Sequence, residues 1–239
     1  MIKYLNVVFF AVMILMNYLA NALPLNNVTT GQLSDSYPNL FVPAGITFSI
    51  WGIIYLLLLI FCVMQFTLTG TGQQGVSAIS WMFALSCVFN ALWIVCWHYK
   101  QVTASLVVML AILVTLVFIN MSLRSLPMGL IKGAFGIYLG WICIATIANV
   151  TALLVDAGWS GFGIQEQTWA IIMIIAGALI VSATILRLNN PFIGLSVVWA
   201  FIGIAIKRQD DYRSIFITAL SAMVIVAGVT IWGFLKKNV

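Results

Sequence analysis

Long apolar runs separated by short polar segments make up most of the chain. A helix needs about 20 apolar residues to cross the hydrocarbon core of a bilayer. We therefore predict an all-α membrane protein with about eight transmembrane helices. The seventh run is short and begins at Asn190–Pro191, so a tilted or partly re-entrant segment is an alternative there. The runs cover roughly residues 4–24, 45–69, 77–98, 102–123, 131–155, 167–187, 191–207 and 213–235.

Composition supports this interpretation. Hydrophobic residues make up 64% of the 239 residues, charged residues only 6%, and the mean hydropathy is +1.16. Soluble domains contain about 25% charged residues, so most of this surface must face lipid. All fifteen charged residues, ten basic and five acidic, lie at or outside the ends of the apolar runs. The pattern therefore gives no indication of a proton relay or ion pathway within the membrane.

The charges between the runs predict an orientation. With the N-terminus on one side, every acidic residue and four basic residues fall on the opposite side. Because basic residues favour the cytoplasmic side, we expect a cell-membrane protein with both termini in the cytoplasm. No targeting segment other than the first run is recognised, which fits a bacterial inner membrane. The basic residues on the N-terminal side are Lys3, Arg124, Lys132, Arg187, Lys236 and Lys237.

The first apolar run has two interpretations. Lys3, the run that follows and the segment 20–22 also fit a signal peptide with a cleavage site. Asn17 and Tyr18 interrupt its apolar part, and the run is long enough to span the membrane. We favour a retained helix; cleavage would leave seven spans and a mature N-terminus on the outside.

Two polar segments indicate how the chain is organised. Residues 24–44 form the longest one and contain prolines and small polar residues, which predict a partly extended loop. Residues 156–166 are rich in glycine. We expect a domain boundary there, between a five-helix bundle at 1–155 and a three-helix segment at 156–239.

Aromatic and amide residues form stripes at helical spacing in the second, third and fifth runs. Asn90 and Asn149 should point inward, because an unpaired amide in hydrocarbon is costly. One interpretation is an aromatic cavity that opens toward the non-cytoplasmic side and is covered by the 24–44 loop. The other is ordinary helix packing, with the asparagines as interhelical hydrogen bonds. The stripes are Phe48, Trp51 and Tyr55; Ser86, Asn90, Trp93 and Trp97; and Tyr138, Trp141, Ala145 and Asn149.

Other chemistry is poorly supported. The basic residues are scattered and form no nucleic-acid-binding stripe, and there is no catalytic motif, so an enzyme is the less favoured class. Cys96 and His98 are too few for a structural zinc, so no metal site is predicted. Gly136 and Gly140 form a GxxxG, which indicates close helix contact and makes a homodimer one candidate assembly.

Three segments carry a family resemblance. Residues 43–55 run from a proline into a helix with Trp51 and Tyr55, residues 89–93 contain an Asn-x-x-Trp pattern, and residues 138–149 contain Tyr-x-x-Trp, then Ala-Thr, then Asn. Their order and placement resemble the TspO/MBR family (tryptophan-rich sensory protein, translocator protein) over roughly residues 1–155.

The resemblance implies a TspO-like five-helix bundle, often dimeric, that binds porphyrins, sterols or synthetic aromatic ligands under the first loop. Three departures matter. Ala44 replaces a second proline, Val150 stands where some members carry a tryptophan, and 150–156 lacks the Tyr and basic residue of the sterol pattern. These departures argue against tryptophan-dependent porphyrin breakdown and cholesterol binding. The ligand-binding candidates are Phe48, Trp51, Tyr55, Asn90, Trp93, Tyr138, Trp141 and Asn149.

We therefore expect a multi-pass protein of the lipid bilayer that binds a flat, porphyrin-like ligand as a sensor or translocator. No cofactor is expected beyond a tetrapyrrole ligand. Two alternatives stay open: a secondary transporter or permease of a small apolar solute, and a porphyrin-modifying membrane enzyme.

Overall fold

The computed structural model describes residues 1–22 and 25–236, and in these residues it contains helices and loops but no strand. Lys237, which contributed to the predicted orientation, lies outside the described residues. Short 3₁₀ turns occur at Leu25–Asn27, Gly45–Ser49 and Gly161–Gly163. The α-helices are α1 Ile2–Asn21, α2 Thr30–Asp35, α3 Ile50–Met64, α4 Gly70–Ile79, α5 Met82–His98, α6 Val102–Ser122, α7 Leu130–Asp156, α8 Glu166–Leu188, α9 Phe192–Arg208 and α10 Arg213–Leu235.

Six of the described helices are long and apolar enough to cross a membrane: α1, α3 with its preceding turn, α6, α7, α8 and α10. The pair α4 and α5 adds a seventh if the two count as one bent span. Of the other two helices, α2 has only six residues and α9 has 17. Helix α9 is about 26 Å long at 1.5 Å per residue, slightly less than a hydrocarbon core of about 30 Å. The all-α membrane fold is confirmed, whereas the count of eight spans stays a prediction.

The third apolar run differs from its prediction. Residues 77–98 were expected to form one span, but the chain bends by 50° between α4 and α5. Ser80 has φ 50° and ψ −132°, which no helix contains, so α4 ends there. The straight part of this span therefore begins at Met82.

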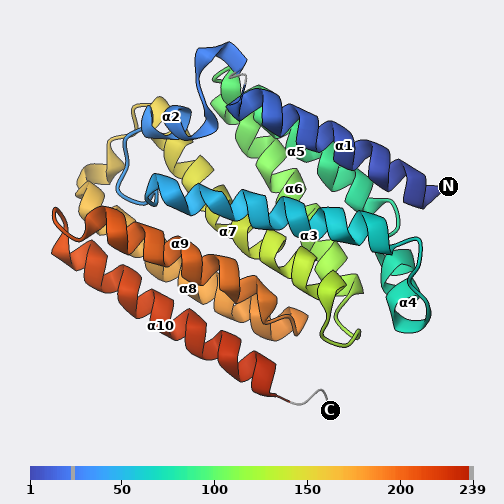
Figure 1. The fold of residues 1–239 in the computed structure, drawn as a ribbon. Coiled ribbons are helices and arrows are strands. Elements are labelled where there is room, and N and C mark those ends of the chain that lie inside the picture. Colours follow the sequence, from blue (N-terminus) through green and yellow to red (C-terminus); the bar gives the residue numbers. More distant parts are fainter. Residues whose placement is uncertain (23–24, 237–239) are drawn as a thin grey trace.

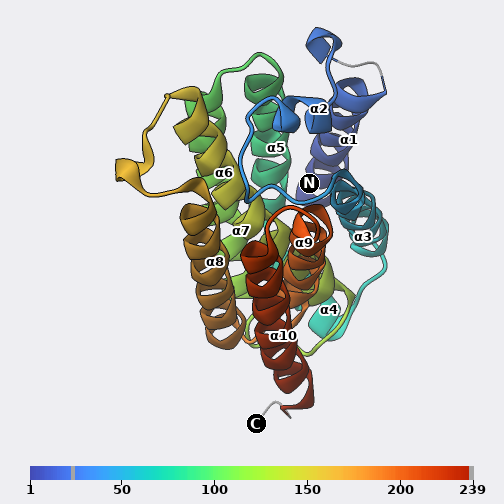
Figure 2. The ribbon, with the colours of Figure 1, turned by 90° about the vertical axis from the view of Figure 1, so that its left-hand side faces the viewer.

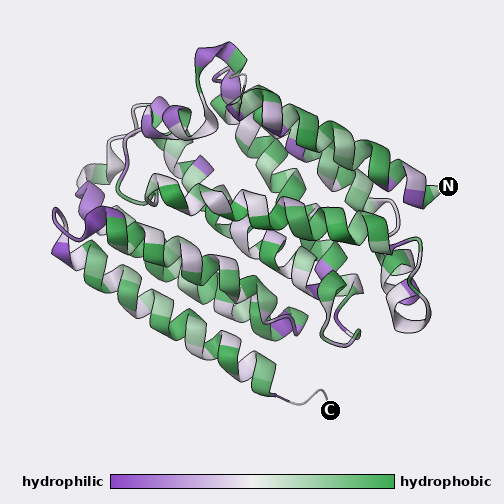
Figure 3. Cartoon of the chain, in the orientation of Figure 1, coloured by the Kyte–Doolittle hydropathy of each residue, from purple (hydrophilic) through white to green (hydrophobic). Residues whose placement is uncertain are grey.

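The helices pack around α7, which lies at the centre (Figure 1). Half of the most apolar stretch of α7 is buried inside the protein, whereas only 22% of the corresponding stretch of α1 is buried. On one side of α7, α6 packs on α7, α5 packs on α6, and α1 packs on α5. On the other side, α9 packs on α7, α10 packs on α9, and α8 packs on α10. Figure 2 shows α8, α9 and α10 side by side along this second side. In Figure 3 the hydrophilic residues gather toward the helix ends and loops, as lipid-facing helices require.

Small residues allow α7 and α9 to approach closely. A Cβ atom added at Gly140 would lie 2.0 Å from the carbonyl oxygen of Ile193, and one at Gly136 would lie 2.7 Å from the Asn190 amide nitrogen. The GxxxG of α7 is therefore occupied by a helix of the same chain. It leaves no free surface on this face for a second copy.

Candidate ligand cavity under the first loop

The segment that connects α1 to α3 is tightly folded. Thr29 and Gln32 form a capping box at the start of α2. After α2, the Asn39 side chain accepts hydrogen bonds from the backbone N–H groups of Phe41 and Val42 at 3.1 and 3.0 Å and donates to the Tyr37 carbonyl at 2.9 Å. We call residues 36–44 the roof loop. The Asn39 side chain stabilises its turn by hydrogen bonds to the neighbouring backbone, a common role of Asn in loops.

Helix α9 binds the roof loop directly. The Arg208 guanidinium donates from Nε to the carbonyl of Leu40 at 3.1 Å and from Nη2 to the carbonyl of Asn39 at 2.8 Å. The N–H of Ala44 donates to the Gly203 carbonyl at 3.0 Å. The loop therefore depends on the last third of the chain for its position.

Two more contacts extend this attachment. The Trp199 indole N–H donates to the Thr47 carbonyl at 2.9 Å, which explains a tryptophan in the middle of an apolar run. Lys207 forms an ion pair of 3.3 Å with Asp35 at the end of α2. This pair is exposed and contributes little energy, so Arg208 and Trp199 are the stronger attachments.

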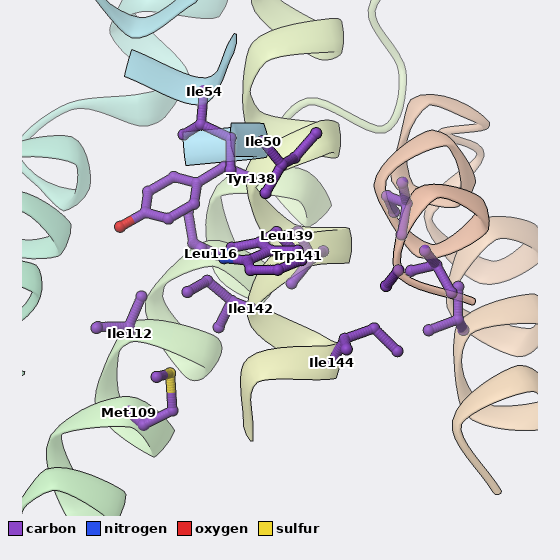
Figure 4. Packing of buried hydrophobic residues seen from close by; sticks show 14 of the residues in the cluster. Ile50, Ile54, Met109, Ile112, Leu116, Tyr138, Leu139, Trp141, Ile142 and Ile144 are labelled. Carbon is purple, nitrogen blue, oxygen red and sulfur yellow. The ribbon is translucent and has the colours of Figure 1, made fainter. Parts of the chain in front are cut away.

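Below the roof loop, the aromatic side chains of α3 and α7 form one cluster around Trp51. Its ring stacks on Tyr55 with a centroid distance of 5.4 Å, and meets Tyr138 at 6.0 Å and Trp141 at 6.1 Å edge to face. Phe48 contacts Trp141 edge to face at 5.9 Å. Figure 4 shows Tyr138 and Trp141 on α7 among aliphatic side chains of α3 and α6. Such offset and edge contacts are the favoured arrangements of aromatic pairs.

The two asparagines of the stripes are buried and paired. Asn90 donates from Nδ2 to the Tyr138 hydroxyl at 3.0 Å and accepts from Nδ2 of Asn17 at 2.8 Å. These bonds link α1, α5 and α7 through one amide. Asn90 is fully buried and its polar atoms have partners within the protein. It therefore supports the wall of the site rather than offering a free polar group.

Asn149 has a similar role nearer the roof loop. Its Oδ1 accepts from the Trp93 indole N–H at 3.2 Å, and its Nδ2 donates to the Ser105 hydroxyl at 3.0 Å. The amide joins α5, α6 and α7, and it fixes the orientation of the Trp93 ring.

Two adjoining cavities lie at this cluster. The larger has a volume of about 360 Å³ and lies between α1, α3 and α5. The smaller, of about 50 Å³, lies directly under the roof loop against α7. Phe48, Trp51 and Trp93 line both. Tyr55 lines the larger cavity only, and Trp141 and Asn149 line the smaller one only; Asn90 and Tyr138 line neither and lie behind the aromatic wall.

Two indole N–H groups at the smaller cavity have no partner. Nε1 of Trp97 and Nε1 of Trp141 are buried and make no hydrogen bond within the described part of the chain. Most buried donors in proteins are paired, because an unpaired one costs about 1–3 kcal/mol. These two donors are available to an acceptor that enters the smaller cavity.

The prediction from sequence missed several wall residues. Asn17 and Tyr18 of α1 and Thr30 of α2 line the larger cavity, and Ser34 and Asn39 line the smaller one. Asn17 carried a usable signal, because a buried amide in an apolar run needs a partner. Thr30, Ser34 and Asn39 lie in the polar segment 24–44, which lacks hydrophobic periodicity, so their position could not be inferred. Tyr18 lies in α1, where its residue type gave no comparable signal.

The arrangement offers apolar contact and a few donors, not reactive groups. No cluster of three or more His, Cys, Asp and Glu side chains occurs among residues 1–22 and 25–236. His98 is buried beneath α2, where its Nε2 lies 3.5 Å from the Thr30 hydroxyl and its Nδ1 lies 2.9 Å from the Ile94 carbonyl. The site is therefore suited to binding an apolar molecule.

Comparison with known families shows to which protein family the chain belongs. The family model described as TSPO-like protein matches residues 3–232. The chain belongs to this family. No curated protein and no solved structure matches it. The match extends well beyond residue 155, so α8, α9 and α10 are part of the region that this TSPO-like protein shares with its family.

Proposed function

We propose that this TSPO-like protein binds a flat apolar ligand of the porphyrin class in the aromatic cavity and acts as a sensor or translocator for it. The observation that carries the proposal is the Trp51 cluster, which presents aromatic rings from α3 and α7 to two adjoining cavities. Aromatic walls with few polar groups are typical of sites for apolar small molecules.

The volumes indicate how such a ligand is held. The larger cavity, about 360 Å³, is within the range of about 300–1,000 Å³ typical of small-molecule sites. The smaller, at about 50 Å³, holds only a peripheral group of the ligand. The unpaired N–H groups of Trp97 and Trp141 lie there and suit a carboxylate or carbonyl substituent. A whole tetrapyrrole requires the roof loop to shift away from α7.

The larger cavity also indicates a route. Its wall includes Tyr18, whose side chain is 58% exposed on α1. The facing wall is α3, which contributes Trp51 and Tyr55. A ligand dissolved in the bilayer therefore reaches the cavity sideways, between α1 and α3, as a molecule of low water solubility requires.

The proposal is tested by titrating the detergent-purified protein with protoporphyrin IX and following tryptophan fluorescence. Saturable quenching is expected, and Trp51→Leu should weaken the affinity by about tenfold or more, because a buried aromatic contact is lost. The matched control is Trp232→Leu, on the lipid-facing side of α10, where the ring is 52% exposed and lines none of the cavities described here.

Absence of saturable binding, or equal affinity in the two variants, contradicts the proposal and favours a transporter of another solute. Light-dependent loss of porphyrin absorbance that requires a tryptophan would favour the enzyme. Uptake of porphyrin into proteoliposomes separates a translocator from a sensor, since only the translocator raises the internal concentration.

A further inference from the structure

A separate cavity of about 340 Å³ lies on the other side of the roof loop. It is bounded by Pro38–Phe41, the C-terminal end of α7, the turn Gly161–Gly163 and the start of α8. Of the residues discussed above, only Asn39 lines both this cavity and the aromatic site. None of the three segments that carry the family resemblance, residues 43–55, 89–93 and 138–149, lines this cavity. We call it the α7–α8 cavity.

Two tryptophans form one wall of the α7–α8 cavity. The rings of Trp159 and Trp169 are 5.0 Å apart, and Phe162 packs edge to face on Trp159 at 5.3 Å. The Trp169 indole N–H donates to the Gly161 carbonyl at 3.0 Å, which fixes the ring. The faces of indole rings carry negative potential and attract cations.

The wall of the cavity carries negative charge. Glu166 lines it, and the connection from Asp156 to Glu166 contains no basic residue. Glu166 is exposed and forms no ion pair or hydrogen bond within the described residues. Burial raises the pKa of Tyr37, and the Asp156 carboxylate raises it further. This second carboxylate therefore acts on the start of the roof loop, beside the cavity.

Two basic residues of α9 lie near the roof loop rather than on the wall of the cavity. The Arg208 guanidinium is bound to the carbonyls of Asn39 and Leu40, and Lys207 is paired with Asp35. Neither Lys nor Arg is among the residues that line the α7–α8 cavity. The Glu166 carboxylate therefore has no cationic partner among the described residues on the cavity wall.

We propose that the α7–α8 cavity binds an organic cation that carries a quaternary ammonium group and an apolar substituent. The ammonium group lies against Trp159 and Trp169 near the Glu166 carboxylate, and the substituent packs on Leu154 and Met173. Aromatic rings with a nearby carboxylate are a chemically suitable site for a cation that cannot donate hydrogen bonds. The same group occurs in free solutes and in choline lipid headgroups. The proposal does not rest on porphyrin binding at the aromatic site.

The test is equilibrium dialysis of the full-length protein in an uncharged maltoside detergent against benzyltrimethylammonium, with protein-free micelles as background. Saturable binding is expected. Trp159→Leu and Glu166→Gln should each weaken it by about tenfold, by removing a ring face and the carboxylate. Trp232→Leu and Asp210→Asn are the matched controls, because neither residue lines the cavity, and both should bind like the parent protein.

A second arm distinguishes the two sources of the ammonium group. The probe is titrated into protein held in nanodiscs of phosphatidylcholine or of phosphatidylethanolamine. Weaker binding in phosphatidylcholine assigns the site to a choline headgroup, and equal binding in both assigns it to a free cation. Both results support the proposal.

No saturable binding above the micelle background overturns the proposal. Unchanged affinity in Glu166→Gln also overturns it. Glu166 is exposed, so this variant keeps its fold, and weaker binding in it is not caused by a folding defect. Protoporphyrin titration of Glu166→Gln serves as the second readout. It should match the parent protein, so failure at this cavity is distinguishable from failure at the aromatic one.

Discussion

Buried asparagines connect the helices at the residue scale. Asn90 and Asn149 each join three helices below the roof loop, and Asn190 links α6 and α7 to the turn between α8 and α9 at the opposite end. There, Nδ2 of Asn190 donates to Oδ1 of Asn120 at 2.7 Å and to the Lys132 carbonyl at 2.9 Å. In an apolar surrounding, such paired amides specify which helix faces meet, because every alternative leaves a polar group unpaired.

The Asn90 amide should therefore matter for stability as well as for the cavity. In Asn90→Ala, the Tyr138 hydroxyl and one Asn17 bond lose their partner, so the free energy of unfolding should fall by about 1–3 kcal/mol. Thermal unfolding in detergent measures this. Gln74→Ala, at an exposed position of α4, is the control and should leave the unfolding temperature unchanged; a similar effect of both variants would contradict the prediction.

The burial of these amides could be predicted, but their partners could not. Helical spacing showed that Asn90 lies on the same face as Trp93, and desolvation cost required a partner for it. Periodicity within one helix does not say which helix lies opposite. Asn17 therefore appeared only as an interruption of an apolar run, although it supplies the bond that holds α1 to α5.

At the scale of elements, α9 has two partners. One face packs closely on the glycines of α7, and its C-terminal end holds the roof loop. Glycine on α7 is a requirement of this contact, because a side chain at position 140 would overlap the Ile193 carbonyl.

Gly140→Ala should separate α7 from α9 and lower the free energy of unfolding by about 1–3 kcal/mol, because backbone rather than a flexible side chain blocks the added methyl group. Gly52→Ala is the matched control on α3, where no atom lies within 4 Å of the added carbon. Alanine has a higher helix propensity than glycine, so Gly52→Ala should leave the free energy of unfolding unchanged or raise it by up to about 1 kcal/mol. Thermal unfolding compares the two, and a neutral Gly140→Ala would argue against the close contact.

Arg208 should control the mobility of the roof loop. Arg208→Lys keeps the charge but loses the two-pronged bond to Asn39 and Leu40, since an ammonium group cannot reproduce the planar guanidinium. Backbone amides of residues 37–44 should then exchange with deuterium about five- to tenfold faster. Arg213→Lys, an exposed residue at the start of α10, should leave this exchange unchanged. Equal deuterium exchange in both variants would show that the roof loop keeps its conformation without Arg208.

The helices themselves could be read from hydropathy, but the break in the third run could not. Apolar runs fix where helices lie, and most observed boundaries fall within a few residues of the predicted ones. The bend at Ser80 depends on one residue with a left-handed φ in a stretch without proline. The attachment of α9 to the roof loop joins segments far apart in sequence, which local patterns cannot reveal.

At the scale of the whole molecule, the alternating helices place the N-terminus and the end of α10 toward the same end of the bundle (Figure 1). The roof loop, the Gly161–Gly163 turn and the loop between α9 and α10 lie at the other end. From the positive-inside tendency we expect the first end in the cytoplasm. The three cavities near the roof loop would then lie in the outer half of the membrane.

Cysteine labelling tests this orientation. Ser160→Cys and Ser125→Cys introduce exposed thiols at opposite ends of the bundle. In intact cells, a membrane-impermeant maleimide should label only Ser160→Cys, and Ser125→Cys should react only after permeabilisation. The parent protein is the control, because its four cysteines are buried or half-buried in the helices. Labelling of Ser125→Cys alone in intact cells would reverse the orientation.

The membrane class and the family could be inferred from composition and three motifs, whereas the extent of the family region could not. The motifs end near Asn149, so the likeness was placed at 1–155, but the family match reaches residue 232. Residues in α8, α9 and α10 act by packing and by holding a loop. Such roles leave no short pattern in a single sequence.

The order of synthesis gives the α9 attachment one more consequence. Arg208 follows its partner Leu40 by 168 residues, and Trp199 follows Thr47 by 152. Until the ribosome has produced α9, the roof loop therefore lacks both attachments. The cover of the aromatic cavity is completed late in synthesis.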